Sequence, residues 1–324
     1  MAKGYFLFGD VRATMPFDPD DVLWFGKQLQ ANGIDVRSAI SPAIAAARNL
    51  AMLASVLKHA AEQLPDTVQV QMGCTASFDF AAAASMISVI RGLRRAHSAN
   101  PELLCDAWRI LGASAPTSTP QQQSNERDHL WEILNTAVYS HFGQAVHLNL
   151  VDAGADVSGN VGGVDWGIEC KVLYSHTISR RVDRIVDGVK QVEDDATVAK
   201  GVVAVSVTDC IDHTPFANSF RNGGAAFASS AAVAALLATR VKQCAIETTT
   251  KSLQRRLARD KDGQPRRKCR AVIYVGQTIA LARGSINVFT AQLTSLRSPP
   301  EAADRAFATQ YHEGWDWLQN SRPG

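Results

Sequence analysis

The stretch GGVDWGIECKVLYS, residues 162–175, decides how the rest of the sequence is interpreted. Two glycines lead into an apolar run that is typical of a buried strand, which we place at 164–174. The run nevertheless contains Glu169 and Lys171, and burying either charge without a partner is costly. Side chains of a strand alternate between its two faces, so Glu169 and Lys171 point to one side and Cys170 to the other. This strand therefore presents an acid and an amine on the same face.

A metal site would explain why an acid and an amine lie together on such a strand. The Glu169 carboxylate can hold Mg²⁺ through oxygen. The Lys171 amine can orient or polarise an attacking water and stabilise the negative charge that develops at phosphorus. A metal ion also needs a second acid from elsewhere in the chain.

The second acid has three candidates. The glycine-rich turn before the strand should fold a preceding strand back, which would place Asp156 roughly opposite Gly167 and next to Glu169. Asp165 shares a face with Glu169, but four residues along a strand span about 13 Å, which is too far to share one ion. Asp152 is a weaker third choice.

Helical and strand patterns follow a definite order around this strand. An amphipathic helix is predicted at 126–142, a strand at 145–151, a helix at 179–195 and a β-branched central strand at 201–208. A further strand, which carries Asp156 and is folded back by the glycine-rich turn, precedes the strand at 164–174. The order is therefore helix, three strands, helix, strand.

The chain divides by composition into three parts. Residues 1–112 are predicted to form a mostly helical domain, with helices at 43–63, 80–95 and 101–111 and a short strand at 67–72. The segment 113–125, ASAPTSTPQQQSN, is predicted to be a linker because it consists mainly of Ser, Thr, Pro and Gln and contains no large apolar residue to anchor it in a core. Residues 126–324 form the second domain, which continues after 208 with a helical stretch at 225–259, strands at 269–282 and 286–296, and a closing helix at 301–319.

Asp156, twelve further residues and then Glu169-Cys170-Lys171 resemble the motif of the PD-(D/E)xK nuclease superfamily, and the order of elements over 126–208 resembles its core. The resemblance implies a restriction-endonuclease-like α/β core, a mixed sheet flanked by helices, preceded here by the mostly helical N-terminal domain. It also implies Mg²⁺ or Mn²⁺ held by Asp156, Glu169 and Glu132 of the first helix. Gln191, or its neighbour Lys190, takes the place of a residue that the second helix often contributes. One departure is that Ala155, not proline, precedes Asp156.

The function that the resemblance implies is a metal-dependent DNA nuclease, a phosphodiester hydrolase of restriction, host defence or repair. Two alternatives stay open. The first is a catalytically inactive nuclease-fold module that binds DNA or another protein. The second is an α/β interaction protein in which Glu169 and Lys171 form only a surface pair.

The net charge of +2 does not by itself indicate a nucleic-acid partner, but one segment is strongly basic. Lys251 to Arg270 contains nine lysines and arginines against Asp260 and Asp262, a density that attracts a phosphate backbone. Solvated charges would explain it equally well. A smaller cluster lies at the start of the second core helix: Arg180, Arg181 and Arg184. Double-strand cutting often requires a dimer, so a homodimer also stays open.

Several classes of protein are disfavoured. The six cysteines contain no CxxC pair, which argues against a zinc knuckle and favours free thiols in a reducing cytoplasm. Cys210 and His213 are too close in sequence to form a catalytic pair, since neighbouring side chains diverge. No apolar run is long enough for a membrane span, so we expect a soluble, cytoplasmic protein without membrane contact.

Overall fold

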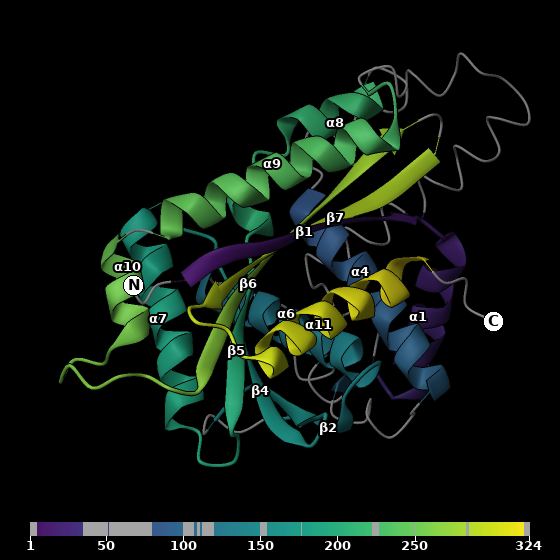
Figure 1. Ribbon diagram of the computed structural model, residues 1–324. Coiled ribbons are helices and arrows are strands. Elements are labelled where there is room, and N and C mark those ends of the chain that lie inside the picture. The colour runs from purple at the N-terminus through teal and green to yellow at the C-terminus, as the bar shows by residue number, and fades with distance from the viewer. Residues whose placement is uncertain are drawn as a thin grey trace, which may run out of the picture.

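The computed structural model describes residues 5–34, 51, 80–99, 107–108, 111, 120–149, 154–175, 177–221, 227–249, 251–282 and 285–320. The described chain is an α/β protein with a mixed sheet of seven strands in the order β1-β7-β6-β5-β4-β3-β2 (Figure 1). The α/β class and the mixed sheet flanked by helices are therefore confirmed.

The predicted order of elements over residues 126–208 is confirmed. The elements are α6 (Pro120–Ser140), β2 (Gln144–Leu148), β3 (Val157–Val161), β4 (Val164–Val172), α7 (Ile178–Asp194) and β5 (Lys200–Ser206). Strands β2, β3 and β4 are antiparallel, whereas β4 and β5 are parallel and connected through α7. Helix α6 begins at Pro120, so residues 120–125 are helical and the predicted linker was too long at this end.

The turn between β3 and β4 is a two-residue loop made of Gly162 and Gly163. Both glycines have positive φ, 59° and 80°. Tight hairpin loops whose twist matches the flanking strands need positive φ at both positions, which glycine adopts without strain. The two glycines thereby fix the register of the strand that carries Glu169.

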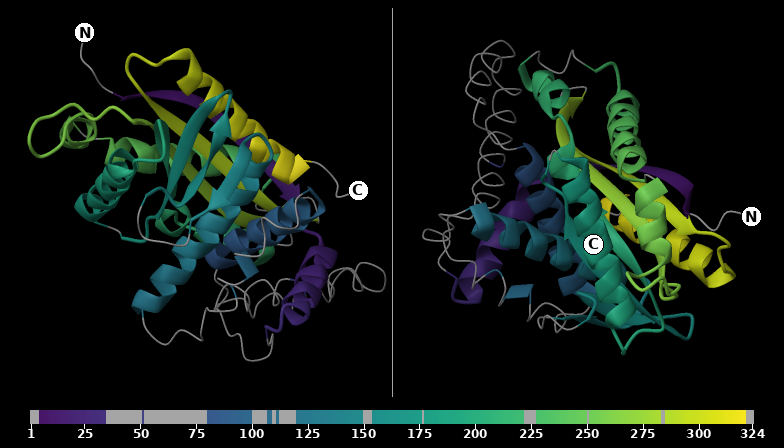
Figure 2. Two further views of the ribbon diagram at one scale, coloured as in Figure 1. Left: turned by 90° about the horizontal axis from the view of Figure 1, so that it is seen from below. Right: turned by 90° about the vertical axis from the view of Figure 1, so that its left-hand side faces the viewer.

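Helices cover both faces of the sheet, as the views in Figure 2 show. The first apolar layer combines α4 (Phe80–Ala99), α6 and α11 (Ala302–Asn320) with side chains such as Ile168 and Cys170 of β4. The second layer combines α7, α9 (Ser230–Thr248) and α10 (Lys251–Ala258) with side chains such as Val203 of β5. The stretch predicted as helical at 225–259 thus contains two helices.

The far half of the sheet contains a strand that the sequence did not reveal. Strand β1 (Tyr5–Pro16) forms the sheet edge and pairs antiparallel with β7 (Ser285–Arg297), which forms a hairpin with β6 (Cys269–Ala282). Near it, α1 (Pro19–Ala31) packs against α4, and α8 (Thr214–Arg221) packs against β6.

The predicted helix at 80–95 and the closing helix are confirmed by α4 and α11. The helix predicted at 43–63 and the strand predicted at 67–72 lie outside the described residues, apart from residue 51 in a helix. Met15 of β1 and Ile90 of α4 belong to the same apolar cluster as Trp315 of α11, so the described N-terminal elements share a core with the rest. Among the described helices, none combines the length and the apolar character that crossing a membrane requires.

Candidate active site

The acid next to Glu169 is Asp156, in a register two residues from the predicted one. Pairing between β3 and β4 ends where Val157 faces Ile168, so Asp156 is level with Glu169, and Ser158 is the residue opposite Gly167. Placing Asp156 opposite Gly167 puts the centre of the hairpin between residues 161 and 162, whereas the loop is centred between Gly162 and Gly163. A shift of the centre by one residue moves the opposing position by two.

The acid and the amine of β4 share one face, as predicted. A Cβ atom added to Gly188 of α7 would lie 3.2 Å from the Cγ atoms of both Glu169 and Lys171, so both side chains pack under α7. Lys171 Nζ donates to Glu169 Oε1. The side chain of Glu169 is fully buried, and its second oxygen, Oε2, has no hydrogen-bond partner. An unpaired buried carboxylate oxygen is costly unless something binds it.

Asp156 completes a pair of neighbouring carboxyl groups. Its Oδ2 accepts a hydrogen bond from Cys170 N at 2.7 Å. Burial raises the pKa of Asp156 to about 8, and the negative charges of Glu169 and Glu132 contribute in the same direction. Burial also raises the pKa of Glu169, although Lys171 opposes this change. The two carboxyl groups therefore do not ionise together readily without a further positive charge.

The amine of Lys171 stays protonated in this environment. Burial would lower its pKa, but the negative charges of Glu169 and Asp156 outweigh that effect and raise the pKa above its ordinary value. The group is a fixed cation at neutral pH and is unsuited to accept a proton.

The other predicted site residues come from the two flanking helices. Glu132 of α6 lies close enough for its charge to raise the pKa of both Asp156 and Glu169, and its Oε2 is 3.1 Å from His129 Nδ1. Gln191 of α7 is half-buried, and its main-chain carbonyl accepts from Asp195 N at 3.0 Å; a role for its side chain stays a prediction. The neighbouring alternative, Lys190, is exposed.

Asp165, the competing acid, lies at the loop end of the hairpin. It is exposed, it faces Asn160 across the hairpin, and its Oδ1 accepts from Asn160 Nδ2 at 2.8 Å. The structure thus brings Asp156, and not Asp165, to Glu169. Asp152 lies outside the described residues.

Sequence reasoning missed Asp128, which precedes Glu132 by one helical turn on α6. Its carboxylate accepts from Val172 N at 3.3 Å and pairs with Arg184 of α7. The spacing of four residues between two acids on one helix was the available signal, because it puts both on one face.

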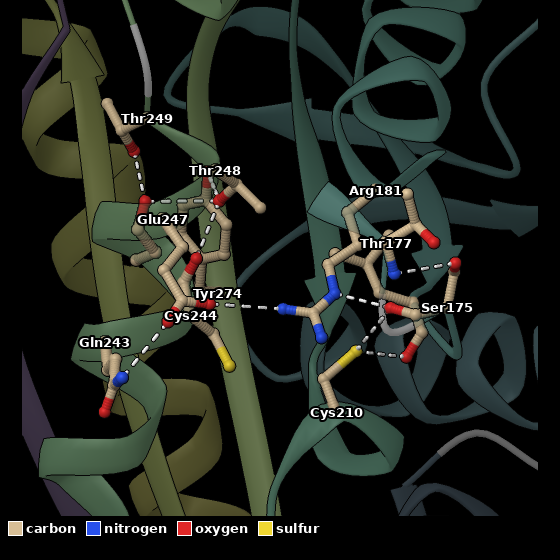
Figure 3. Close-up of polar contacts among 12 residues, drawn as sticks. Ser175, Thr177, Arg181, Cys210, Gln243, Cys244, Glu247, Thr248, Thr249 and Tyr274 are labelled. Atoms are coloured by element: carbon tan, nitrogen blue, oxygen red, sulfur yellow. Dashed lines mark hydrogen bonds and ion pairs between the residues drawn. The ribbon is translucent and has the colours of Figure 1, made fainter. Parts of the chain in front are cut away.

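Cys210 and Arg181 bind the main chain that follows β4. Cys210 Sγ donates to Leu173 O at 3.0 Å, and burial raises the pKa of its thiol to about 12. Arg181 Nε donates to Ser175 O at 2.5 Å, and its Nη1 lies 3.4 Å from Glu247 Oε2 (Figure 3). Both side chains hold the main chain that follows β4. The two ring nitrogens of His213 lie 2.9 Å from Thr278 Oγ1 and from Thr208 O.

The basic segment from 251 to 270 is not uniformly accessible. Arg270 is buried, and its Nη2 lies 2.7 Å from Asp304 Oδ2, so this arginine serves the fold. Lys268 Nζ donates to the main-chain oxygen of Asp195. Several other members are exposed, on α10 and in the loop that follows it: Arg255, Arg256, Arg259, Lys261 and Arg267. These, and not the whole segment, are available to a phosphate backbone.

The described residues contain no group of three or more His, Cys, Asp or Glu side chains already arranged as a metal cluster. Asp156 and Glu169 nevertheless fit a divalent cation. Apart from Lys171, the group next to the Glu169 carboxylate is the Asp156 carboxyl, which has a raised pKa and hydrogen-bonds to Glu169 when it is protonated, so a cation that displaces this proton would be held by both acids. Carboxylate oxygens supplemented by water are the ligands that Mg²⁺ usually takes in proteins.

Comparison with known proteins finds no match: no protein-family model matches the chain, and no curated protein or solved structure does. A function is therefore inferred from the geometry of this site and from the motif that it contains.

Proposed function

We propose that this protein is a metal-dependent DNA nuclease whose core is of the restriction-endonuclease-like type. The observation that carries the proposal is the buried Glu169 carboxylate, which is paired to Lys171 and lies beside a second buried acid, Asp156, with a raised pKa. The adjacent Asp156 and the order of helices and strands support the same interpretation.

Asp156 and Glu169 would hold the cation, Mg²⁺ or Mn²⁺, and Glu132 would add negative charge from α6. A cation bound there lowers the pKa of water and stabilises the charge that develops on a phosphodiester. Since Lys171 is held as a cation, its part is to orient the attacking water and to stabilise negative charge near phosphorus, not to remove a proton. Burial under α7 keeps these groups in place and limits competing water.

DNA would be bound partly by the exposed arginines and lysines of α10 and the loop after it. Their charges attract phosphates independently of base sequence, which suits a substrate recognised through its backbone. A role in restriction, host defence or repair, and action as a homodimer, belong to the same proposal.

A second candidate is a nuclease-fold module that binds DNA without cutting it. The observation in its favour is that the described acids do not form a ready-made cluster of three metal ligands. Such a protein would keep the basic surface and gain nothing from the pair formed by Glu169 and Lys171.

The test is cleavage of supercoiled plasmid and linear DNA with Mg²⁺, Mn²⁺ or EDTA, with wild type and Glu169→Gln. Asp165→Asn is the matched control, because Asp165 is an exposed acid on the same strand. We expect metal-dependent cleavage that is lost only in Glu169→Gln, and a melting temperature that Mn²⁺ raises in wild type and in the control. Retardation of DNA in a gel without cleavage in either metal would favour the second candidate.

A further inference from the structure

Strand β4 loses its neighbour on one side at the point where the candidate active site begins. Its pairing with β3 ends at Ile168, while its pairing with β5 on the other side continues to Val172. We call residues 169–172, on the side that faces away from β5, the open edge of β4. Main-chain N–H and C=O groups on such an edge need other partners, because unsatisfied buried groups are costly.

Side chains take the place of the missing strand along the open edge. The Cys170 N–H donates to Asp156 Oδ2 at 2.7 Å. Two residues further, the Val172 N–H donates to Asp128 Oδ1 at 3.3 Å, and the Val172 C=O accepts from Arg184 Nε at 2.9 Å. Lys171 therefore lies between two main-chain positions that side chains hold.

Asp128 and Arg184 act on Val172 as one unit. Arg184 Nη2 forms an ion pair with Asp128 Oδ2, so the two side chains bind each other as well as the strand. Asp128 comes from α6 and Arg184 from α7, so the pair joins the helices on the two faces of the sheet. A planar guanidinium bonds through several nitrogens in fixed directions, which is what bridging a carboxylate and a carbonyl requires.

We propose that the Asp128–Arg184 pair is a positioning device, which holds the end of β4 so that Glu169 and Lys171 keep their places. This inference rests on the proposed function, since those two residues are the groups that it positions. Misplacement of a reacting group by about 1 Å can cost about 100-fold in rate. The pair therefore affects turnover even though neither residue needs to touch the substrate.

The main chain beyond Val172 has supports of its own, so loss of the pair should be a local change. Leu173 N donates to Ser206 O at 2.9 Å, and Leu173 O accepts from Cys210 Sγ. Ser175 O accepts from Arg181 Nε (Figure 3). The competing role for Arg184 is a direct phosphate contact. Its Nε and Nη2 already bind within the protein, and its guanidinium lies 5.3 Å from the centre of the Tyr174 ring.

The test uses Asp128→Asn and Arg184→Lys, with Asp194→Asn as the control, because Asp194 is an exposed residue at the end of the same helix as Arg184. Arg184→Lys keeps the charge but replaces the guanidinium by a single ammonium nitrogen, so the bonds to Val172 O and Asp128 no longer come from two nitrogens in fixed directions. We expect kcat to fall by about 10- to 100-fold with KM nearly unchanged in the first two variants. We also expect hydrogen–deuterium exchange of the peptide containing Val172 to become faster, while the control matches wild type in both respects.

Two results would overturn the positioning role: unchanged kcat at temperatures well below melting, or unchanged exchange with a raised KM, which would indicate a phosphate contact. If Asp128→Asn or Arg184→Lys fails to fold, the same measurements on the other variant test the positioning role. Hydrogen–deuterium exchange can be measured whether or not the protein cleaves DNA. A wild-type protein that cuts no DNA would refute the proposed nuclease function, and the exchange rates would then decide alone whether the pair holds the strand.

Discussion

At the residue scale, Lys171 is the side chain whose removal has the most specific consequence. Lys171→Met keeps a similar length without the charge, so it removes the ion-pair partner of a fully buried Glu169. Cleavage should fall by about 100- to 1,000-fold, as for loss of one preorganised charge-stabilising group. The metal-free protein should melt at a lower temperature, and Mn²⁺ should raise that temperature by more than in wild type, because the cation replaces the lost charge. An equal rise of both melting temperatures with Mn²⁺ would contradict the coupling between Lys171 and the metal site, and no rise in either protein would contradict the site itself.

The raised pKa of Asp156 predicts how stability depends on pH. Its pKa is about 8 in the folded protein against an ordinary value of 3.8, so between these values the folded state keeps a proton that the unfolded chain has lost. Raising the pH through this window therefore lowers the free energy of unfolding, by at most about 1.4 kcal/mol for each step of one in pH. Above pH 8 this contribution is lost.

Urea unfolding in EDTA at pH 5, 7 and 9 would measure this dependence. Asp156→Asn should flatten the curve, whereas Asp165→Asn should leave it as in wild type, since Asp165 is exposed. Because a bound cation must displace the proton of Asp156, cleavage with Mg²⁺ should also rise as the pH approaches 8. Stability that increases with pH in wild type would show that Asp156 is ionised in the folded state.

The same residues mark how far a sequence determines a site. The identity of Glu169 and Lys171 as a same-face pair follows from the alternation of one strand, and Asp156 follows from a glycine turn. The link between Asp128 and Val172 joins positions 44 residues apart, through a contact that exists only because β3 ends early. No local pattern encodes such a contact, since it depends on where two elements separate in space.

At the scale of elements, α7 approaches β4 and β5 closely because Gly188 has no side chain. A Cβ atom there would lie 3.0 Å from Val203 Cγ1 and 3.2 Å from Glu169 Cγ. Gly188→Ala should therefore destabilise the protein by about 1–3 kcal/mol through overpacking, against the gain of about 1 kcal/mol that alanine normally brings to a helix. It should also lower cleavage, because relief of the contact moves Glu169.

Gly26→Ala is the matched control, since Gly26 also lies inside a helix but an added Cβ would meet nothing within 4 Å. This change should stabilise the protein by about 0.5–1 kcal/mol. Urea unfolding of both variants gives the comparison. Stabilisation of similar size in the two would mean that α7 has room to move away from β4.

The elements differ in how clearly the sequence indicates them. Strands β4 and β5 and helix α7 have strong periodic patterns, and the structure confirms them within one or two residues at most ends. Strand β1 was missed, and its register against β7 shifts between Phe8 and Asp10. A bulge reverses which residues face inward, so the alternation expected of a strand is broken in the middle. The start of α6 was missed because its first turns are polar and give no apolar period.

At the scale of the whole molecule, α11 packs against the start of β5 and β6 through Asp304. The Asp304 carboxylate is almost fully buried, and it accepts from Arg270 Nε and Nη2 at 2.9 and 2.7 Å and from Lys200 Nζ at 3.0 Å. Since removing one partner leaves a buried charge poorly compensated, Arg270→Ala should cost about 3 kcal/mol of stability. The basic segment therefore contains a residue that the fold needs, beside residues that face solvent.

Arg267→Ala separates these two uses of positive charge. The side chain of Arg267 is exposed, so its loss should leave the free energy of unfolding unchanged within about 0.5 kcal/mol. DNA affinity should weaken, and the slope of log affinity against log salt should decrease by about 1 if the side chain contacts a phosphate. Arg270→Ala, measured where it is still folded, should bind DNA as wild type does. The reverse pattern, with DNA affinity lost in Arg270→Ala and kept in Arg267→Ala, would place the DNA elsewhere on the molecule.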